Sequence, residues 1–249
     1  MQKQKGRGRL AGLRELGVVF ALLLPALPAA ALSFGIDTNS PSQSDFHAVA
    51  GDMTAAFDYK PLEPSDAGGV TGFALGAYGS YAPTRDSGAW SRLTGDPSDQ
   101  IGVAGVSARK GLPFGIDVGG FYGWVADTDA HVYGGDLRYA VLAGSALVPA
   151  VALRASYTGA SNLGDLSYRS YGVDASVSKG FPFLAPYAGI GYVWSTIKAD
   201  GQYHLESESI DRVKAFAGLR LALGPLETTA EYERLGSNNV YDLRFGVSF

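Results

Sequence analysis

The sequence predicts an all-β fold: a transmembrane antiparallel up-and-down β-barrel of about ten strands. Two observations predict it: an apolar leader typical of export, and apolar residues that alternate with polar ones at every second position. Side chains on a strand point alternately to opposite faces, so each alternating segment has one apolar and one polar face. A barrel that crosses a bilayer needs this pattern, because lipid surrounds it while its interior is polar.

Residues 1–31 are expected to be a Sec-type secretory signal peptide. Five basic residues precede an almost wholly apolar run from Val18 to Ala31. This run is shorter than the roughly 20 residues with which an α-helix crosses hydrocarbon. It ends with Ala29 and Ala31 in the arrangement that signal peptidases accept, so we expect cleavage after Ala31. The remaining chain has a net charge of −8, which disfavours nucleic acid as a partner.

Residues 32–67 form an amino-terminal segment that can be interpreted in two ways. Ser44 could cap a short amphipathic helix with apolar residues every three to four positions, at Phe46, Val49, Met53 and Phe57. Residues 44–60 also alternate at period two, and with a short strand at residues 32–36 they would give twelve strands. Ten and twelve both satisfy the even strand number of bacterial barrels. We favour ten strands and a helix that plugs the lumen or lies beneath it.

Residues 68–249 are assigned to the barrel, because ten alternating segments follow one another there. Each has about 10–14 residues, the length with which a tilted strand crosses a bilayer, whereas strands of soluble sandwiches have about five or six. The segments are residues 70–81, 101–110, 115–126, 131–143, 150–159, 168–179, 185–198, 212–223, 226–235 and 240–249.

The connections between these segments are alternately short and long. The short ones, such as residues 110–115 and 179–184, contain the Gly and Pro of tight turns and are expected to be periplasmic. The long ones, at residues 82–100, 159–166 and 199–210, are polar and are expected to be extracellular. Tyr and Trp gather toward the segment ends, as in the aromatic girdles of membrane barrels.

The last nine residues resemble the terminal strand by which outer-membrane barrels are presented to the bacterial barrel-assembly machinery. The residues that carry this assembly signal are Tyr241, Leu243, Phe245, Val247 and Phe249. More broadly, residues 110–122, 136–139 and 179–191 resemble a family of uncharacterised proteobacterial outer-membrane β-barrel proteins. The resemblance implies a Gram-negative outer-membrane location, with membrane lipids and the assembly machinery as partners. We expect a monomer.

Placing the apolar face on lipid sends charged residues into the lumen. Acidic and basic residues are nearly balanced there, so we expect cross-strand ion pairs, in which Glu227, Glu231 and Glu233 face cations on the adjacent strands. Small inward residues such as Gly76 and Gly119 could leave a partial lumen, so a narrow porin-like channel and a structural barrel both stay open. The predicted lumen charge network comprises Asp136, Arg138, Arg154, Asp174, Arg212, Lys214, Arg220, Glu227, Glu231, Glu233, Asp242 and Arg244, with Asp117 on the same inward face.

A rim-active hydrolase is the alternative from a different class. Asp127, Asp129 and His131 lie at one hairpin tip, and His204 and Glu206 lie in a long loop nearby. Carboxylates with a histidine can activate water, and the ten-stranded omptin proteases are similar in placing such residues at the outer rim. Asp- and Thr-rich tips are also ordinary turn chemistry, so we expect no enzyme activity. The chain has no Cys, and we expect neither a metal nor an organic cofactor.

Overall fold

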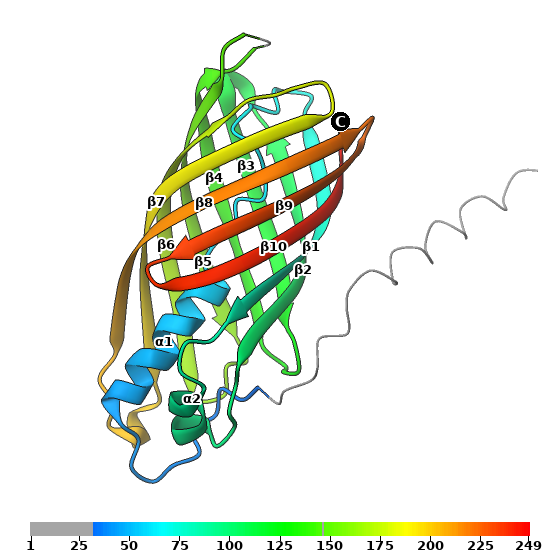
Figure 1. Ribbon diagram of the computed structural model, residues 1–249. Coiled ribbons are helices and arrows are strands. Elements are labelled where there is room, and N and C mark those ends of the chain that lie inside the picture. The colour runs from blue at the N-terminus through cyan, green and yellow to red at the C-terminus, as the bar shows by residue number, and fades with distance from the viewer. Residues whose placement is uncertain (1–31, 146) are drawn as a thin grey trace, which may run out of the picture.

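Ten antiparallel strands close into a barrel in which each strand pairs with its neighbours in chain order and β1 pairs with β10 (Figure 1). This computed structural model describes residues 32–145 and 147–249, so the predicted signal peptide lies outside the described residues. The predicted ten-stranded antiparallel barrel is confirmed. The strands are β1 (Phe73–Pro83), β2 (Gln100–Gly111), β3 (Ile116–Val125), β4 (His131–Ala143), β5 (Ala150–Ser161), β6 (Leu166–Ser178), β7 (Leu184–Ala199), β8 (Glu208–Leu223), β9 (Leu226–Leu235) and β10 (Asn238–Ser248).

The amino-terminal segment contains helix α1 (Gln43–Phe57), so the twelve-stranded alternative is wrong. The helical spacing prevails because it buries Phe46, Val49 and Met53 together. A second helix, α2 (Ser87–Thr94), lies in the β1–β2 connection and was not expected. The Asp86 side chain caps its first turn, and Gly95 ends it in the left-handed conformation. No helix in the described part of the chain is both long and apolar enough to span a bilayer.

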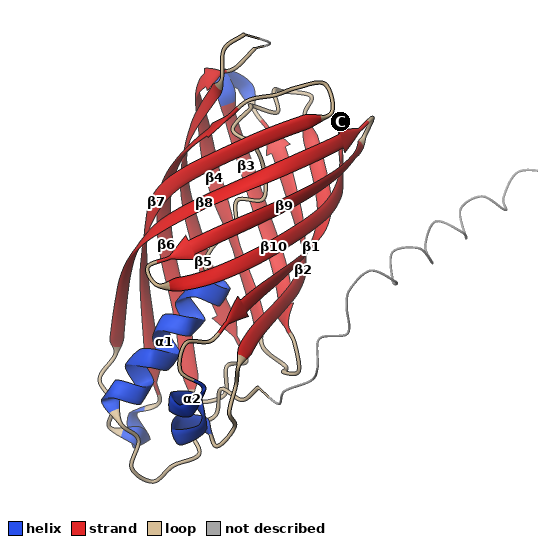
Figure 2. Ribbon diagram, viewed as in Figure 1, coloured by secondary structure: helices blue, strands red, loops and turns tan. Residues whose placement is uncertain are grey.

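The two ends of the barrel differ (Figure 2). The carboxyl terminus and the short turns lie at one end, which we call the turn end, and one of these turns contains the 3-10 helix η2 (Pro113–Gly115). The opposite end, which we call the loop end, carries α2 and the longer connections, including the 3-10 helix η3 (Gly201–Tyr203). The tight β9–β10 turn points toward the loop end but lies short of it, where the N–H of Gly236 donates to the Val213 carbonyl of the longer strand β8.

The outer face of the barrel is apolar on every strand. Aromatic side chains pack against one another on this face near the loop end, as in the Tyr122–Trp124 pair, whose ring centroids are 5.3 Å apart. In water, so large an exposed apolar surface would be unfavourable, whereas hydrocarbon matches it. Exposed side chains from each strand in turn are Leu75, Val106, Val118, Leu137, Leu153, Val173, Ile190, Val213, Leu226 and Leu243.

The amino-terminal segment crosses the lumen from one end to the other. At the loop end, the backbone N–H of Asp37 donates to the carbonyl of Leu93, at 3.0 Å. Helix α1 then runs into the barrel (Figure 1), and residues 58–72 continue to the turn end. There the N–H of Gly68 donates to Asp117, and the N–H of Gly111 donates to Gly72, both at 3.0 Å. The helix therefore plugs the lumen, rather than lying beneath it.

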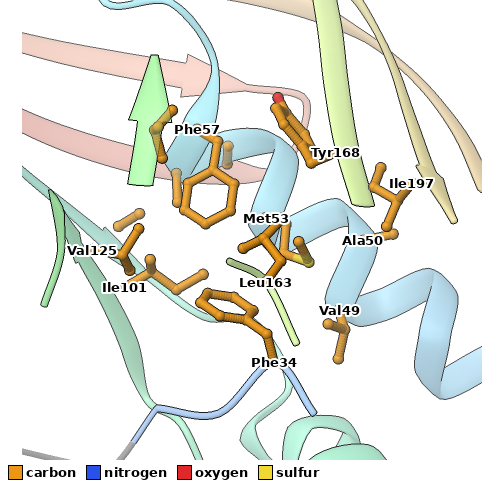
Figure 3. Packing of buried hydrophobic residues seen from close by; sticks show 14 of the residues in the cluster. Phe34, Val49, Ala50, Met53, Phe57, Ile101, Val125, Leu163, Tyr168 and Ile197 are labelled. Atoms are coloured by element: carbon orange, nitrogen blue, oxygen red, sulfur yellow. The ribbon is translucent and has the colours of Figure 1, made fainter. Parts of the chain in front are cut away.

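A hydrophobic core fills the half of the lumen nearer the loop end. Its side chains come from α1, from residues 32–36 and α2, and from the inward faces of the strands. Figure 3 shows Met53 and Phe57 of α1 beside Phe34 and the wall residue Ile101. The buried members include Phe34, Phe46, Val49, Met53, Phe57, Trp90, Leu93, Ile101, Val103, Val125, Val132, Leu163, Tyr168, Val193, Ile197, Ile210, Leu235 and Val240.

Candidate functional site

The candidate site is the occupied lumen, and its outer part is a packed aromatic centre. The ring of Phe57 lies 5.8 Å from that of Phe34 and 5.4 Å from that of Tyr168, measured between centroids. Phe34 in turn meets the ring of Trp90 at 5.9 Å in an edge-on arrangement. These contacts join the plug helix to a strand, to the segment before the helix and to α2, so the plug is built into the fold.

Polar contacts fix the plug helix at the same depth. The buried carboxylate of Asp52 accepts hydrogen bonds from Trp90 Nε1 at 3.0 Å and Asn238 Nδ2 at 2.7 Å. The backbone N–H of Arg85 also donates to it, at 3.2 Å. On the opposite wall, the hydroxyls of Thr54 and Ser195 lie 2.7 Å apart. The buried side chains of Asp52 and Thr54 are therefore both hydrogen-bonded, as polar groups in a stable core are.

The outer end of the segment is held by exposed contacts. Arg92 of α2 pairs with Asp45 of α1 at 2.7 Å, and His47 Nδ1 lies 2.6 Å from a carboxylate oxygen of Glu208. In the neighbouring loop, the hydroxyl of Tyr203 donates to Asp165 at 2.9 Å, and this hydrogen bond raises the pKa of the Tyr203 hydroxyl. Ion pairs that water reaches contribute little, so these contacts orient the rim more than they stabilise it.

Between helix α1 and the turn end, ion pairs take the place of the apolar core. Lys60 donates to Glu233 at 2.8 Å and to the carbonyl of Ala55 at 2.7 Å. Lys214 lies 2.7 Å from Asp58 and 3.1 Å from Glu233. Lys60 therefore links the amino-terminal segment, which we call the threaded segment, to β9, and Lys214 links it to β8. Each of these four buried charges has an opposite charge beside it.

Glu63 is the point at which three strands meet the threaded segment. Its carboxylate forms an ion pair with Arg109 of β2, and it lies 3.8 Å from Arg138 of β4 and 3.7 Å from Arg244 of β10. Each arginine also has a second acidic partner on the wall. Asp136 lies 3.0 Å from Arg109, and the other two pairs join Arg138 with Asp117 and Arg244 with Glu227.

Further hydrogen bonds follow the segment toward the turn end. The Tyr59 hydroxyl donates to Asp136 at 2.6 Å. Arg138 donates to the backbone carbonyl of Pro64 at 2.6 Å. The Ser65 hydroxyl donates to that of Ser176 at 2.9 Å. Residues 58–68 form neither a helix nor a strand. Their polar groups form hydrogen bonds with the barrel wall instead.

The predicted lumen charges lie on the inner wall, but their partners differ in part from those expected. Cross-strand pairs join Glu227 to Arg244 and to Arg220, and Glu233 to Lys214. Asp136, Arg138, Arg154, Asp174, Lys214, Glu227, Glu231, Glu233, Asp242 and Arg244 are buried. Arg154 lies over the ring of Tyr59, 5.5 Å from its centroid, and 3.7 Å from Asp136 and 3.9 Å from Asp174.

Two of the expected pairings are not those of the structure. Glu231 accepts from the Tyr187 hydroxyl at 2.6 Å and from the backbone N–H of Leu62 at 3.1 Å, rather than from a cation. Asp242 lies directly opposite Glu231 in the β9–β10 ladder, so two carboxylates are neighbours there. The position of Arg212 in β8 places it nearer the loop end than the charged half of the lumen is. It therefore lies away from the lumen carboxylates and donates to the carbonyl of Asp211 at 3.0 Å.

Sequence reasoning missed the residues of the site that lie outside the predicted set. Arg109 occupies an inward position at period two from Ser107, so the alternation of its strand could have revealed it. Asp58 and Lys60 fall on the polar side of the period-two pattern of residues 44–60, but that pattern does not show which wall charges they meet, and Glu63 lies beyond it. Their roles follow only from the wall charges they meet.

The small inward residues accommodate large side chains and do not leave an open lumen. A Cβ at Gly76 would collide with the Arg244 guanidinium, and one at Gly119 would collide with the Asp136 carboxylate. A cavity of about 30 Å³ lies between the segment and the wall, lined in part by Lys60, Tyr78 and Ser80. That volume holds one or two water molecules. A wider recess of about 290 Å³ lies at the turn end.

The residues considered for a rim hydrolase do not come together. His131 lies on the outer face and stacks on Tyr122, with 5.5 Å between the ring centroids. His204 is exposed beyond η3, and no hydrogen bond or ion pair in the described part of the chain joins it to Asp127, Asp129 or His131. Within residues 32–145 and 147–249, no group of three or more His, Asp or Glu residues is arranged to hold a metal ion.

The carboxyl-terminal strand completes the barrel. Tyr241, Leu243, Phe245 and Val247 lie at alternate positions of β10, and Tyr241 and Leu243 are exposed on its outer face. Phe249 and Phe73 exchange backbone hydrogen bonds of 2.9 and 3.0 Å, so the last residue joins the ladder with the start of β1.

Comparisons with known proteins give likenesses of fold. No family model matches the sequence, and no curated protein matches it. Solved structures similar to this one include the N-terminal β-barrel domain of Pseudomonas aeruginosa OprF, at 15% identity and a TM-score of 0.40, covering 73% of this chain and 99% of that one. The KdgM porin matches at 11% identity and a TM-score of 0.38, covering 70% and 99%. LpxR from Salmonella typhimurium matches at 8% identity and a TM-score of 0.39, covering 71% and 99%.

The geometry defines the class of this protein. A closed antiparallel barrel with an apolar outer face on every strand is a transmembrane β-barrel. Within that class, this chain is a ten-stranded barrel whose lumen is occupied by its own amino-terminal segment.

Proposed function

We propose that the protein is a structural outer-membrane β-barrel whose lumen is closed at rest. The observation that carries the proposal is the hydrophobic core across the loop-end half of the lumen, built from α1, α2 and the inner wall. Exposing that core to water would cost about 25 cal/mol per Å² of apolar surface, so an open state is strongly disfavoured. The predicted signal peptide and the carboxyl-terminal pattern support the outer membrane of a Gram-negative bacterium as its location, with membrane lipids and the barrel-assembly machinery as partners.

The proposed orientation places the turn end in the periplasm and the loop end outside the cell. In bacterial barrels, short turns face the periplasm and longer loops face outward. The loop end carries α2 and η3, and the turn end carries the carboxyl terminus. In this orientation the aromatic pairs such as Tyr122 and Trp124 lie near the outer interface of the membrane.

Conductance of the refolded protein in a planar bilayer tests this proposal. We expect a silent membrane, although heat-modifiable migration shows that the barrel is folded. Stable conductance steps from the unmodified chain would contradict closure at rest.

A gated channel is the second candidate, because the half of the lumen nearer the turn end is polar and leads to the recess of about 290 Å³. Displacement of the segment would expose a wall of arginines and carboxylates that could select solutes by charge. A Thr54→Cys/Ser195→Cys pair distinguishes the two candidates, since these side chains touch in the closed state. A channel would conduct with the pair reduced and fall silent when the pair is oxidised, whereas a structural barrel is silent in both states.

A further inference from the structure

Residues 32–37 and the carboxyl terminus lie at opposite ends of the barrel. Residues 32–37 are held at the loop end by the hydrogen bond from Ile36 N–H to Asp165 at 2.9 Å, and the Tyr203 hydroxyl lies 3.2 Å from the Ile36 carbonyl. The strand that follows the segment, β1, begins at the turn end, where Phe73 pairs with Phe249. The chain therefore reaches its first strand only by running the whole length of the lumen.

The wall is closed around the inner part of this segment, residues 58–68. Strands β1 and β10 are paired from Ala74 with Ser248 to Tyr81 with Tyr241. The other neighbouring strands are also paired in antiparallel ladders, with one register shift between β4 and β5. A helix with its side chains is about 10–12 Å wide. Helix α1 also contacts α2, so the segment is held on both sides of the closed part of the wall.

Contacts of the segment bridge the place where the wall closes. Glu63 meets Arg109 and Arg138 on the strands that follow β1, and it meets Arg244 on β10. Asp52 likewise joins Trp90, which follows β1, to Asn238 at the start of β10. Both carboxylates thus link the first part of the barrel to β10 from inside the lumen. Each of them has all of its partners only when β10 is in place beside β1.

We propose that the barrel carries its own amino-terminal segment across the outer membrane, closing around it so that the chain at residues 32–40 is displayed on the cell surface. The side assigned to each end rests on the orientation in the proposed function. The threading itself does not, because it requires only that residues 32–40 share a side with the long loops. The barrel would then act as a one-time conduit for its own chain, and it would display any short sequence placed immediately before Leu32.

Single-cysteine labelling tests the proposal, and the absence of natural cysteine makes each variant unambiguous. Ser40→Cys reports the segment, Ser207→Cys reports a long loop, and Gly180→Cys reports a turn, where a Cβ meets nothing within 4 Å. A membrane-impermeant maleimide is added to intact cells that express the full chain, and then to cells with a permeabilised outer membrane. Heat-modifiable migration confirms that each variant is folded.

We expect Ser40→Cys and Ser207→Cys to react on intact cells, and Gly180→Cys to react only after permeabilisation. Protection of position 40 together with position 180, while position 207 reacts, would overturn the threading. If positions 40 and 207 are both protected while position 180 reacts, the proposed orientation and surface display are wrong, although the segment still crosses the lumen.

Discussion

The two halves of the lumen hold the same segment by different physical means. Near the loop end, Phe57 and its neighbours bury apolar surface against the wall, as in a soluble protein core. Near the turn end, Glu63 and its neighbours form ion pairs and hydrogen bonds with wall arginines. Opening an apolar core costs free energy in proportion to the apolar surface that is exposed to water. In a buried charged network, the cost arises when one partner is removed and the other charge is left unpaired. The plug is therefore anchored by its apolar half near the loop end and positioned by its charged half near the turn end.

Truncation in the apolar half is the most severe test of this difference. Phe57→Ala removes a buried ring that contacts Phe34 and Tyr168, and we expect it to lower the free energy of unfolding by about 3–5 kcal/mol. Urea titration in detergent measures the change. Phe114→Ala is the matched control, since Phe114 is 90% exposed at a turn. Equal losses in the two variants would show that the loop-end core does not anchor the plug.

Glu63 tests the charged half. Glu63→Ala removes the carboxylate shared by Arg109, Arg138 and Arg244, and we expect it to cost about 1–3 kcal/mol, because each arginine keeps one other acidic partner. Glu63→Gln retains the volume and one acceptor oxygen, so its loss should be smaller. The same urea titration compares the two variants. An unchanged unfolding midpoint in Glu63→Ala would show that Glu63 does not stabilise the charged half of the lumen.

Glu231→Ala tests the hydrogen bonds that Glu231 of the wall accepts. The substitution leaves the Tyr187 hydroxyl and the Leu62 N–H without their acceptor, and we expect a loss of about 1–2 kcal/mol. A double-mutant cycle with Tyr187→Phe isolates the hydrogen bond, because the double variant should lose less than the sum of the single variants. Strict additivity would mean that the two side chains do not interact.

The exposed clamp at the rim should matter least. Arg92→Ala removes the ion pair with Asp45, and we expect the smallest loss of the four variants, one that shrinks as salt is added. Unfolding midpoints at low and high ionic strength measure it. A large loss that does not depend on salt would indicate that the rim clamps the plug more strongly than its exposure allows.

The sequence predicted the wall far better than the content of the lumen. Period-two alternation placed segments such as 131–143 and 226–235 with the bounds that β4 and β9 have in the structure. Helical spacing located α1, because Phe46, Val49 and Met53 share one buried face. These signals are local, since each depends on residues within one element.

The threaded path could not be predicted because its partners are far away in the sequence. Lys60 meets Glu233, and Leu62 meets Glu231, in pairs separated by about 170 residues. Residues 58–72 are irregular, so nothing in their own pattern shows that they run through the barrel. The Glu231 prediction failed in its partner for the same reason: the acceptor serves the segment and Tyr187 rather than a cation on the wall.

Disulfide formation between the segment and the wall shows whether the segment occupies the lumen. Thr54→Cys/Ser195→Cys samples the apolar half and Ser65→Cys/Ser176→Cys samples the polar half, where the native hydroxyls lie 2.7 and 2.9 Å apart. The control pair, Ser65→Cys/Ser207→Cys, joins positions at opposite ends of the barrel. Because the parent chain has no cysteine, oxidised and reduced electrophoresis reports each pair alone. We predict that both lumen pairs crosslink in the folded protein and that the control does not. A folded barrel in which neither lumen pair crosslinks would contradict the occupied lumen.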